Sequence, residues 1–181
     1  LPRSNPTIAN FTLLGERESS TSDVGMLLRA GTAGTFVNGI VVDFNETCLD
    51  VDDSPTFPQA NSGALSVQST FFDCAVNFST DADGFDEAAF FNGTGFPANT
   101  NNATGTTSLA GFSFVTDFSV LPDGFTPNNA GGVVPSPTGP EASVTAVDPS
   151  TIDPFFDSVD YIGAVEDADD DWYLGWTLQQ Q

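Results

Sequence analysis

The sequence predicts an all-β fold: a short right-handed parallel β-helix over about residues 5–84, with a strand and an aromatic C-terminal segment packed on it. The first observation is an apolar run that recurs along the chain, as IANFTLLG (8–15), FVNGIVVDF (36–44) and SVQSTFFDC (66–74). The second is its period, because aligning Asn10, Asn38 and Gln68 gives steps of 28 and 30 residues, which is typical of a solenoid. The third is a shorter apolar run between the long ones, VGMLLRAG (24–31) and TCLDVDDS (47–54), which gives each repeat two strands.

Residues 1–84 are expected to hold the repeats, because their runs are rich in Val, Ile, Phe, Leu and Thr, as strands that bury one face should be. We expect no convincing amphipathic helix, since the nearest candidate, DGFDEAAFF (83–91), is short and is broken by Asn92-Gly93. Short strands bounded by turn residues also occur in antiparallel folds. An antiparallel β-sandwich or jelly roll is therefore the alternative architecture.

Three further segments follow the repeats. Residues 85–121 are expected to be an insert and a strand, because LAGFSFVTDFSVL (109–121) alternates Phe with Ser after a polar loop. Residues 122–153 are rich in Pro and Gly and predict a linker or long surface loop, since proline fixes φ and lacks the amide donor. Residues 154–181 are rich in aromatic side chains, which we expect to fold back on the solenoid or to dock on a neighbouring molecule.

The charge balance restricts the partners of the chain. Its 25 acidic residues face three arginines and no lysine or histidine, for a net charge of −22. Such a surface repels phosphate backbones and anionic lipid, so we expect no nucleic-acid partner and no binding to membrane surfaces. The sequence contains no apolar run of about 18 residues that would span a bilayer and no charged-then-apolar leader. A mature secreted or cell-surface chain is the expectation.

The same composition argues against catalysis, and we expect the protein not to be an enzyme. Without His and Lys there is no imidazole base and no Schiff-base amine. The rival hypothesis is carbohydrate cleavage by carboxylates, for which Asp50, Asp52 and Asp53 are the candidates. A lyase would also need a basic residue such as Arg29, and an arginine in a solenoid turn is more often a salt-bridge partner.

The two cysteines, Cys48 and Cys74, are 26 residues apart, close to one repeat. In a coiled stack they would lie on adjacent coils within bridging distance, which predicts a disulfide of the kind that secreted chains keep. Two buried free thiols are the alternative.

Five asparagines head an N-x-[ST] sequon and predict N-linked glycans: Asn10, Asn45, Asn77, Asn92 and Asn102. For Asn10 a second interpretation stands beside this one. An asparagine next to a turn of a β-helix often stacks its amide along the solenoid, which would explain the alignment of Asn10 with Asn38 without a sugar.

Acidic residues cluster at three places, and the cluster STDADGFDE has the D-x-D-G spacing reminiscent of a calcium loop. Asp81, Asp83 and Asp86 are its candidate ligands, although the twelve-residue loop with its bidentate glutamate is incomplete. No cofactor is required by the sequence, and calcium is the one ion for which it offers a candidate site. The alternative is that the clusters are turns and solvated faces of an acidic surface.

Two passages resemble a family of uncharacterised bacterial β-helix proteins that are secreted or lipid-anchored. One is NPTIANFTLLG followed by LLRAGTAGTFVNGIVVDFNETCLDVDD, and the other is FFDSVDYIGAVEDADDDWYLGWT; together they cover roughly residues 5–53 and 155–177. The resemblance implies a solenoid scaffold and an extracytoplasmic location, and it brings no catalytic residues. Longer members of the family carry further β-helix upstream, which implies that this chain resembles their C-terminal part.

These observations favour an extracellular structural protein that self-assembles head-to-tail, through its N-terminal strand, into a homo-oligomer or surface filament. Each coil of a solenoid needs a neighbour or a cap, and this sequence opens almost directly on a coil. Ile8, Phe11 and Leu13 would form the joint, with Trp172 and Trp176 as a cover. The alternatives are an adhesin or glycan-binding module that stacks sugars on Trp and Tyr, and a proteolytic fragment with no separate role.

Overall fold

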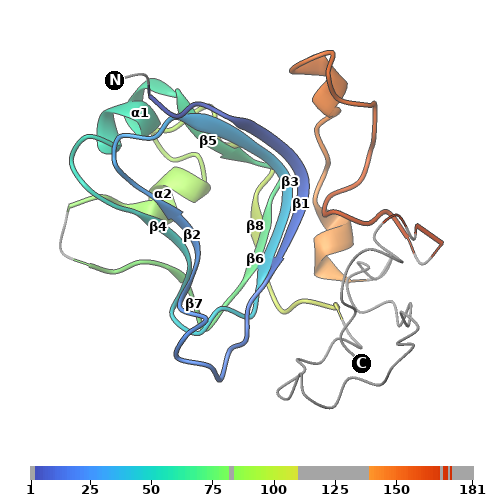
Figure 1. Cartoon of the computed structure of the whole chain (residues 1–181), viewed down its shortest axis with the longest axis horizontal. Coiled ribbons are helices and arrows are strands. Elements are labelled where there is room, and N and C mark those ends of the chain that lie inside the picture. The colour runs from blue at the N-terminus through green and yellow to red at the C-terminus, as the bar shows by residue number, and fades with distance from the viewer. Residues whose placement is uncertain (1–2, 82–83, 110–138, 168, 171, 173–181) are drawn as a thin grey trace, which may run out of the picture.

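The computed structural model of the chain describes residues 3–81, 84–109, 139–167, 169, 170 and 172. Its strands form two sheets that enclose a shared interior, into which Figure 1 looks. The larger sheet holds, in order, β1 (Thr7–Leu14), β3 (Gly34–Val42), β6 (Phe71–Asp73) and β8 (Ala103–Thr104), with β5 (Leu65–Gln68) also paired with β3. The smaller sheet holds β2 (Val24–Leu28), β4 (Thr47–Val51) and β7 (Val76–Phe78).

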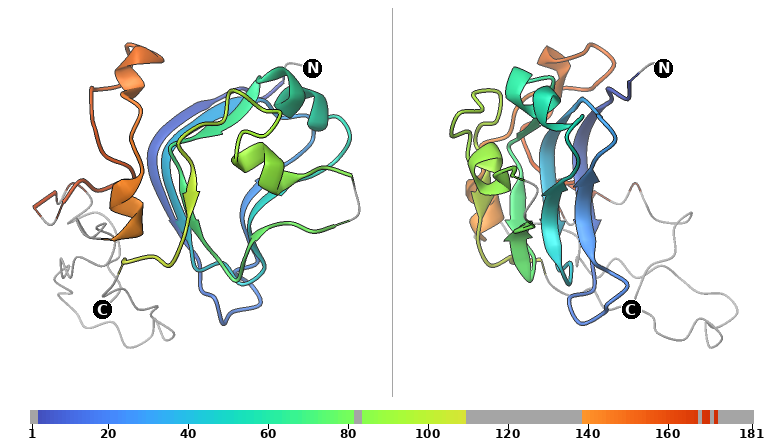
Figure 2. Two further views of the ribbon diagram at one scale, coloured as in Figure 1. Left: turned by 180° about the vertical axis from the view of Figure 1, so that it is seen from behind. Right: turned by 90° about the vertical axis from the view of Figure 1, so that its left-hand side faces the viewer.

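Each strand pair of the described residues is parallel. The chain visits the larger sheet and then the smaller one, and each return places a strand beside its predecessor, as the right-hand view of Figure 2 shows. This arrangement confirms the parallel β-helix. An antiparallel sandwich or jelly roll would require opposite strand directions.

The larger sheet bends at one residue in each coil. Asn10, Asn38, Ser69 and Asn101 take left-handed backbone conformations there, with φ of 52°, 58°, 48° and 57°. Val37 pairs with Gln68 before the bend, and Ile40 pairs with Phe71 after it. Ser69 is therefore the structural equivalent of Asn38, and the alignment with Gln68 was wrong by one residue. The third coil has a serine where the first two have an amide, so the side chain gave no guide to the register.

The parallel register stacks apolar side chains into columns that fill the interior. One column contains Leu13, Val41 and Phe72, from β1, β3 and β6. A second column contains Met26, Leu49 and Phe78, from β2, β4 and β7. The predicted disulfide is confirmed: Cys48 and Cys74 are bonded, with their Cα atoms 5.5 Å apart.

Two short helices interrupt the strands, where the sequence had predicted no convincing helix. α1 (Phe57–Ser62) has a proline in its first turn and ends at Gly63, whose φ of 77° a glycine adopts without strain. α2 (Glu87–Phe91) begins after Asp86, whose carboxylate accepts a hydrogen bond from Ala89 N at 2.8 Å. Helices of five or six residues are too short to show a helical period in the sequence.

The stack also continues beyond residue 84, where the sequence had placed its end. β8 pairs with β6, so the larger sheet extends to Thr104. Of the strand expected over 109–121, all but Leu109 lies outside the described residues. Residues 122–138 of the expected linker lie outside them as well. Residues 139–153 of that linker contain two 3₁₀ turns, η2 (Pro140–Ser143) and η3 (Pro149–Thr151).

The C-terminal segment from residue 139 to 165 runs along the outer face of the larger sheet, in orange beside β1 and β3 in Figure 1. Ile162 is buried there against Ile40, Val42 and Phe71 of the sheet. None of the helices in the described part of the chain has the length and hydropathy of a membrane span.

Candidate functional site

The N-terminal end of the stack is open and apolar. A cavity of about 240 Å³ lies there, and every residue that lines it is apolar: Ile8, Phe11, Leu13, Gly25, Met26, Leu27, Leu28 and Phe36. Ile8 and Leu27 keep 41% and 42% of their surface exposed. The sequence had proposed Ile8, Phe11 and Leu13 as assembly residues, and the structure brings all three to this one cavity.

The cavity arises because the first coil has a neighbour on one side. Within the described residues β1 pairs with β3, β2 pairs with β4, and neither has a second strand partner. An edge strand presents N–H and C=O groups that are ready to pair with another chain. Both sheets end in such an edge at the same end of the stack, and the apolar lining lies between the two edges.

Phe11 fills part of the space over the second coil. Its ring lies against Gly39, where an added Cβ would overlap it, and meets the Phe36 ring edge-on at a centroid distance of 6.4 Å. Position 39 therefore accepts no side chain larger than hydrogen while Phe11 keeps this place. The first coil therefore packs against the second coil on one side, and within the described residues no coil covers its other side.

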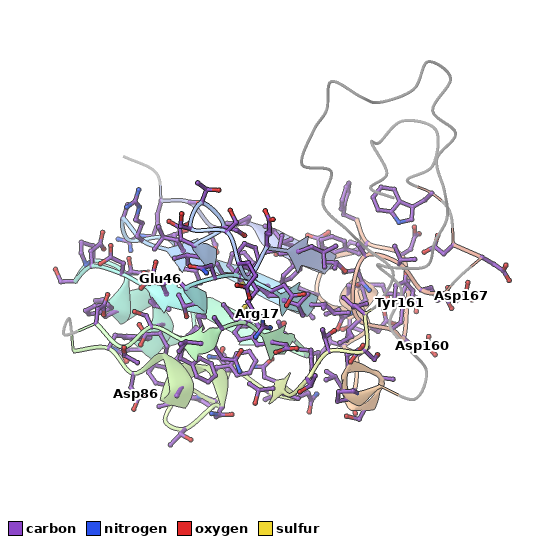
Figure 3. All side chains as sticks on the ribbon, turned by 90° about the horizontal axis from the view of Figure 1, so that it is seen from below. Arg17, Glu46, Asp86, Asp160, Tyr161 and Asp167 are labelled. Atoms are coloured by element: carbon purple, nitrogen blue, oxygen red, sulfur yellow. A yellow bond between two sulfur atoms is a disulfide. The ribbon has the colours of Figure 1, made fainter. Side chains whose placement is uncertain are left out.

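The opposite end of the stack is capped. The Phe91 ring of α2 stacks on Phe72 at a centroid distance of 4.2 Å, and Phe90 packs beside it against Phe85 and Phe96. In Figure 1 α2 lies over the interior, and Figure 3 shows Asp86, the residue that precedes α2, at this end.

Side chains from the loop before β8 continue the cap. Asn99 accepts a hydrogen bond from Val67 N and Asn102 accepts one from Thr70 N, both at 2.9 Å. Asn102 also donates to Val67 O at 2.7 Å. The two amides therefore occupy backbone groups of Val67 in β5 and of Thr70 that a further coil would use, which makes the two ends of the stack unequal.

Trp172 lies on the C-terminal segment next to β1. Thr12 Oγ1 of β1 accepts a hydrogen bond from Ala164 N at 2.9 Å, and Ala164 O accepts one from Trp172 Nε1 at 2.8 Å. The side chain keeps 52% of its surface exposed. Trp176, its predicted companion in the cover, lies outside the described residues.

Tyr161 of the same segment stands beside acidic residues. Burial raises the pKa of its hydroxyl, and the nearby carboxylates of Asp170 and Glu166 raise that pKa further. Figure 3 shows Tyr161 together with Asp160 and Asp167 on this segment. The surface next to the open end is therefore aromatic and strongly negative.

Of the three proposed calcium ligands, the structure describes Asp81 and Asp86. Asp86 is the N-terminal cap of α2, and Asp83 lies outside the described residues, so that Asp81 alone remains without a described structural role. In the ranges that the structure describes, no group of three or more His, Cys, Asp or Glu side chains is arranged to hold a metal ion.

The candidate catalytic carboxylates lie in and after β4. Asp53 accepts hydrogen bonds from Ala30 N and Thr56 Oγ1, both at 2.9 Å, and has a left-handed φ of 66°. It therefore holds the turn that follows β4. Asp50 lies within β4 at the register position of Leu27.

Arg17 and Arg29 lie in different surroundings. Arg17 forms ion pairs of 3.0 Å with Asp43 and Asp73 and donates to the carbonyl oxygen of Cys74 at 3.2 Å. Burial opposes its charge, yet the hydrogen bonds to Asp73 and Asp43 raise its pKa above the ordinary value. Arg17 thus ties the turns of three successive coils, as a salt-bridge partner in a solenoid turn should. Arg29 is exposed at the end of β2.

The five sequon asparagines differ in their surroundings. Asn10, Asn45 and Asn102 donate their amide N–H groups to backbone carbonyl oxygens of other segments. Asn77 lies half-buried in β7, where its Oδ1 accepts from Cys74 N at 3.0 Å. Asn92 is exposed at the C-terminal end of α2.

Sequence reasoning missed the contribution of β2 to the cavity, from Met26, Leu27 and Leu28. The signal was present, because VGMLLRAG was recognised as the second strand of the first coil. It also missed Asn99 and Asn102 as capping residues. These amides lie in a loop rich in Asn, Gly and Thr, where the sequence pattern marked Asn102 only as a sequon and did not mark Asn99.

Comparison with known proteins matches the chain to a family model. A family model described as a pectate-lyase-like β-helix domain matches residues 1–113 of the 181. The match supports a β-helix family as such and does not reach the narrower bacterial family that the sequence motifs resemble. No curated protein and no solved structure matches the chain.

Proposed function

We propose that this chain, which belongs to the family of pectate-lyase-like β-helix domains, is an extracellular structural module that self-associates through its N-terminal coil. The observation that carries the proposal is the apolar cavity of about 240 Å³ between the free edges of β1 and β2. Coils of a solenoid bury their apolar faces against neighbours, so an end of this kind is stabilised by a partner that continues the stack.

The partner is a second copy of the chain, joined head to head. A head-to-tail filament, which the sequence favoured, needs an open acceptor at the far end. There α2 covers the interior and Asn99 and Asn102 bind the backbone of Val67 and Thr70, so that within the described residues only the short strands β7 and β8 end the sheets with one partner each. The N-terminal end, in contrast, is complementary to itself. A two-fold axis perpendicular to the stack would pair β1 antiparallel with β1 of the second copy and β2 with its β2, and such a contact closes as a dimer.

The net charge of −22 opposes association of two copies, but the charged side chains lie outside the cavity that forms the joint. The cavity lining contains no charged side chain. Repulsion between two copies therefore acts over a distance and is screened by salt, whereas apolar burial is not. We expect dimers to form more readily as the salt concentration rises.

No catalytic step belongs to this proposal. The absence of His and Lys from the sequence and the use of Asp53 in a turn support a structural role. Secretion is supported by the Cys48–Cys74 disulfide, since such bonds persist in oxidising compartments.

The experiment introduces a charge into the joint. We predict that Ile8→Asp and Leu27→Asp each shift the full chain from dimer to monomer in sedimentation velocity at about 0.5 M NaCl, where the screening length is only a few ångström. Val76→Asp is the matched control, because Val76 is an aliphatic strand residue that is 51% exposed and lies outside the cavity. It should leave the dimer intact. Association unaffected by both joint variants would refute the proposal.

A second candidate function rests on Trp172. Its indole keeps 52% of its surface exposed and donates a hydrogen bond from Nε1 to Ala164 O, and an exposed aromatic side chain of this kind can stack on a sugar. On a chain of this charge the sugar would be uncharged. Titration with neutral oligosaccharides, followed by Trp fluorescence, tests this function: a saturable change that is lost in Trp172→Ala would support it, and a flat titration would remove it.

A further inference from the structure

Each of the five sequons offers the same chemical group, the side-chain amide nitrogen, but the fold leaves these nitrogens in different states. N-glycosylation replaces one of the two amide hydrogens with a sugar, and the substituted nitrogen keeps a single N–H. A folded glycoprotein therefore requires an amide with at most one hydrogen bond to donate and a residue that is exposed to solvent.

Two sequons fail the first requirement. Asn102 Nδ2 donates to Val67 O at 2.7 Å and to Phe91 O at 2.8 Å. Asn10 Nδ2 donates to Tyr161 O at 2.8 Å and to Gly163 O at 3.3 Å. A sugar on either nitrogen would break one of these bonds and separate segments that the amide holds together.

Two others fail the second requirement. Asn45 is half-buried, and its Nδ2 lies 2.5 Å from Arg17 O, inside the turn that the Arg17 ion pairs close. Asn77 is half-buried in β7, and its Oδ1 accepts a hydrogen bond from the backbone N–H of the disulfide-bonded Cys74.

Asn92 meets both requirements, and of the five it alone is exposed. Its Nδ2 donates one hydrogen bond, to Ala88 O at 2.8 Å, which a substituted amide can keep. The next residue, Gly93, turns the chain with a φ of 73°, and Thr94 of the sequon is exposed as well. We infer that Asn92 is the N-glycosylation site of this protein.

The modification is an oligosaccharide transfer from a polyprenyl pyrophosphate donor. The bond between C1 of the first sugar and the pyrophosphate oxygen breaks, and a bond between that C1 and Asn92 Nδ2 forms. The nitrogen loses one proton, and polyprenyl pyrophosphate leaves. Because Asn92 follows α2, the glycan would extend from the capped end of the stack, away from the N-terminal cavity.

The test is secretion of the full chain from a eukaryotic cell line that N-glycosylates. Intact mass before and after peptide N-glycosidase counts the glycans. Release in ¹⁸O water marks each formerly glycosylated asparagine as ¹⁸O-labelled aspartate, and chymotryptic peptides locate the mark, since the chain has 17 Phe and few tryptic sites. The expected result is one glycan, at Asn92. A glycan on any of the other four sequons, or none on Asn92, would overturn the assignment.

Two pairs of variants separate the site from effects on folding. Thr94→Ala should remove the glycan, and Thr94→Ser, which preserves the sequon, should retain it. Thr104→Ala destroys the Asn102 sequon without touching the Asn102 amide, and Thr104 is exposed in β8. It should leave the glycan mass unchanged. Loss of a glycan in Thr104→Ala would contradict the assignment even if Asn92 were also modified.

Discussion

Asn38 Nδ2 donates a hydrogen bond of 3.1 Å to Asn10 Oδ1, joining two coils at the bend of the larger sheet. Asn38 also donates to Val147 O at 2.7 Å and accepts from Val147 N at 2.9 Å. Asn10 in turn donates to Tyr161 O at 2.8 Å. The amide pair therefore binds the C-terminal segment to the sheet, which agrees with the interpretation of Asn10 as a stacked amide.

We predict that Asn38→Ala lowers the free energy of unfolding by about 1–3 kcal/mol, because it removes the amide of the buried Asn38 and leaves half-buried polar groups of Asn10 and Val147 without these partners. The left-handed backbone at this position adds to the cost for alanine. Asn38→Gly loses the same bonds but relieves the backbone, so it should be less harmful by roughly 1 kcal/mol. Urea unfolding measures both. Two variants of wild-type stability would show that the amide pair is dispensable.

The disulfide supports the next prediction. Cys48 and Cys74 are 26 residues apart and join adjacent coils. Removing the bond in a Cys48→Ala, Cys74→Ala double variant should lower the free energy of unfolding by about 3 kcal/mol, because the unfolded chain is no longer constrained. Unfolding of the native protein with and without reductant provides the comparison, and the double variant itself should not respond to reductant. Equal stability of the oxidised and reduced forms would contradict the prediction.

Arg17 should contribute stability that Arg29 does not. Arg17→Met removes two ion pairs and the contacts to backbone carbonyls of Asp73 and Cys74. We expect a loss of about 1–2 kcal/mol, because the group is partly exposed and solvent screens it. Arg29→Met, a change of the same chemistry at an exposed position, should stay within about 0.5 kcal/mol of the wild type. Equal effects in denaturant unfolding would show that the three-coil contact of Arg17 is not stabilising.

We predict that the raised pKa of Tyr161 makes the folded protein lose stability in alkaline solution. Its pKa is raised in the folded state above the ordinary value of 10.0, first by burial and then by Asp170 and Glu166. The folded protein therefore holds its proton more tightly than the unfolded chain, and this contribution is complete below pH 10.0 and is lost as the pH rises through the folded-state pKa. Thermal unfolding followed across this range should show a weaker decline for Tyr161→Phe than for the wild type. An identical decline in both would contradict the cause assigned to the shift.

The solenoid could be predicted from sequence because its strands repeat a local pattern. Apolar runs with two strands in each repeat appear in the residues themselves, and the Cys48–Cys74 spacing follows from the period. The register of the third coil could not be predicted in the same way. Ser69 carries the left-handed bend without an amide, and Phe71 and Phe72 are both apolar, so either could be aligned with Val41.

The sequence predicted the part of the candidate site that β1 contributes and missed the part that β2 contributes. Ile8, Phe11 and Leu13 belong to one strand, whereas Leu27 joins them only because the coil closes and brings β2 across the interior. The cap at the other end was missed for a related reason. Asn99 reaches Val67, which is 32 residues earlier in the chain, and α2 is too short to show a helical period. Contacts of this range depend on the fold as a whole.

The central claim is that the open N-terminal end is a joint between two copies of the chain. Sedimentation equilibrium of the purified protein across a range of NaCl concentrations tests it most directly. The account predicts a mass that approaches twice 18.9 kDa as the salt concentration rises and does not grow further, because the capped ends leave no second joint. A mass of one chain at every salt concentration would contradict the joint, and a mass that keeps growing with protein concentration would contradict its head-to-head form.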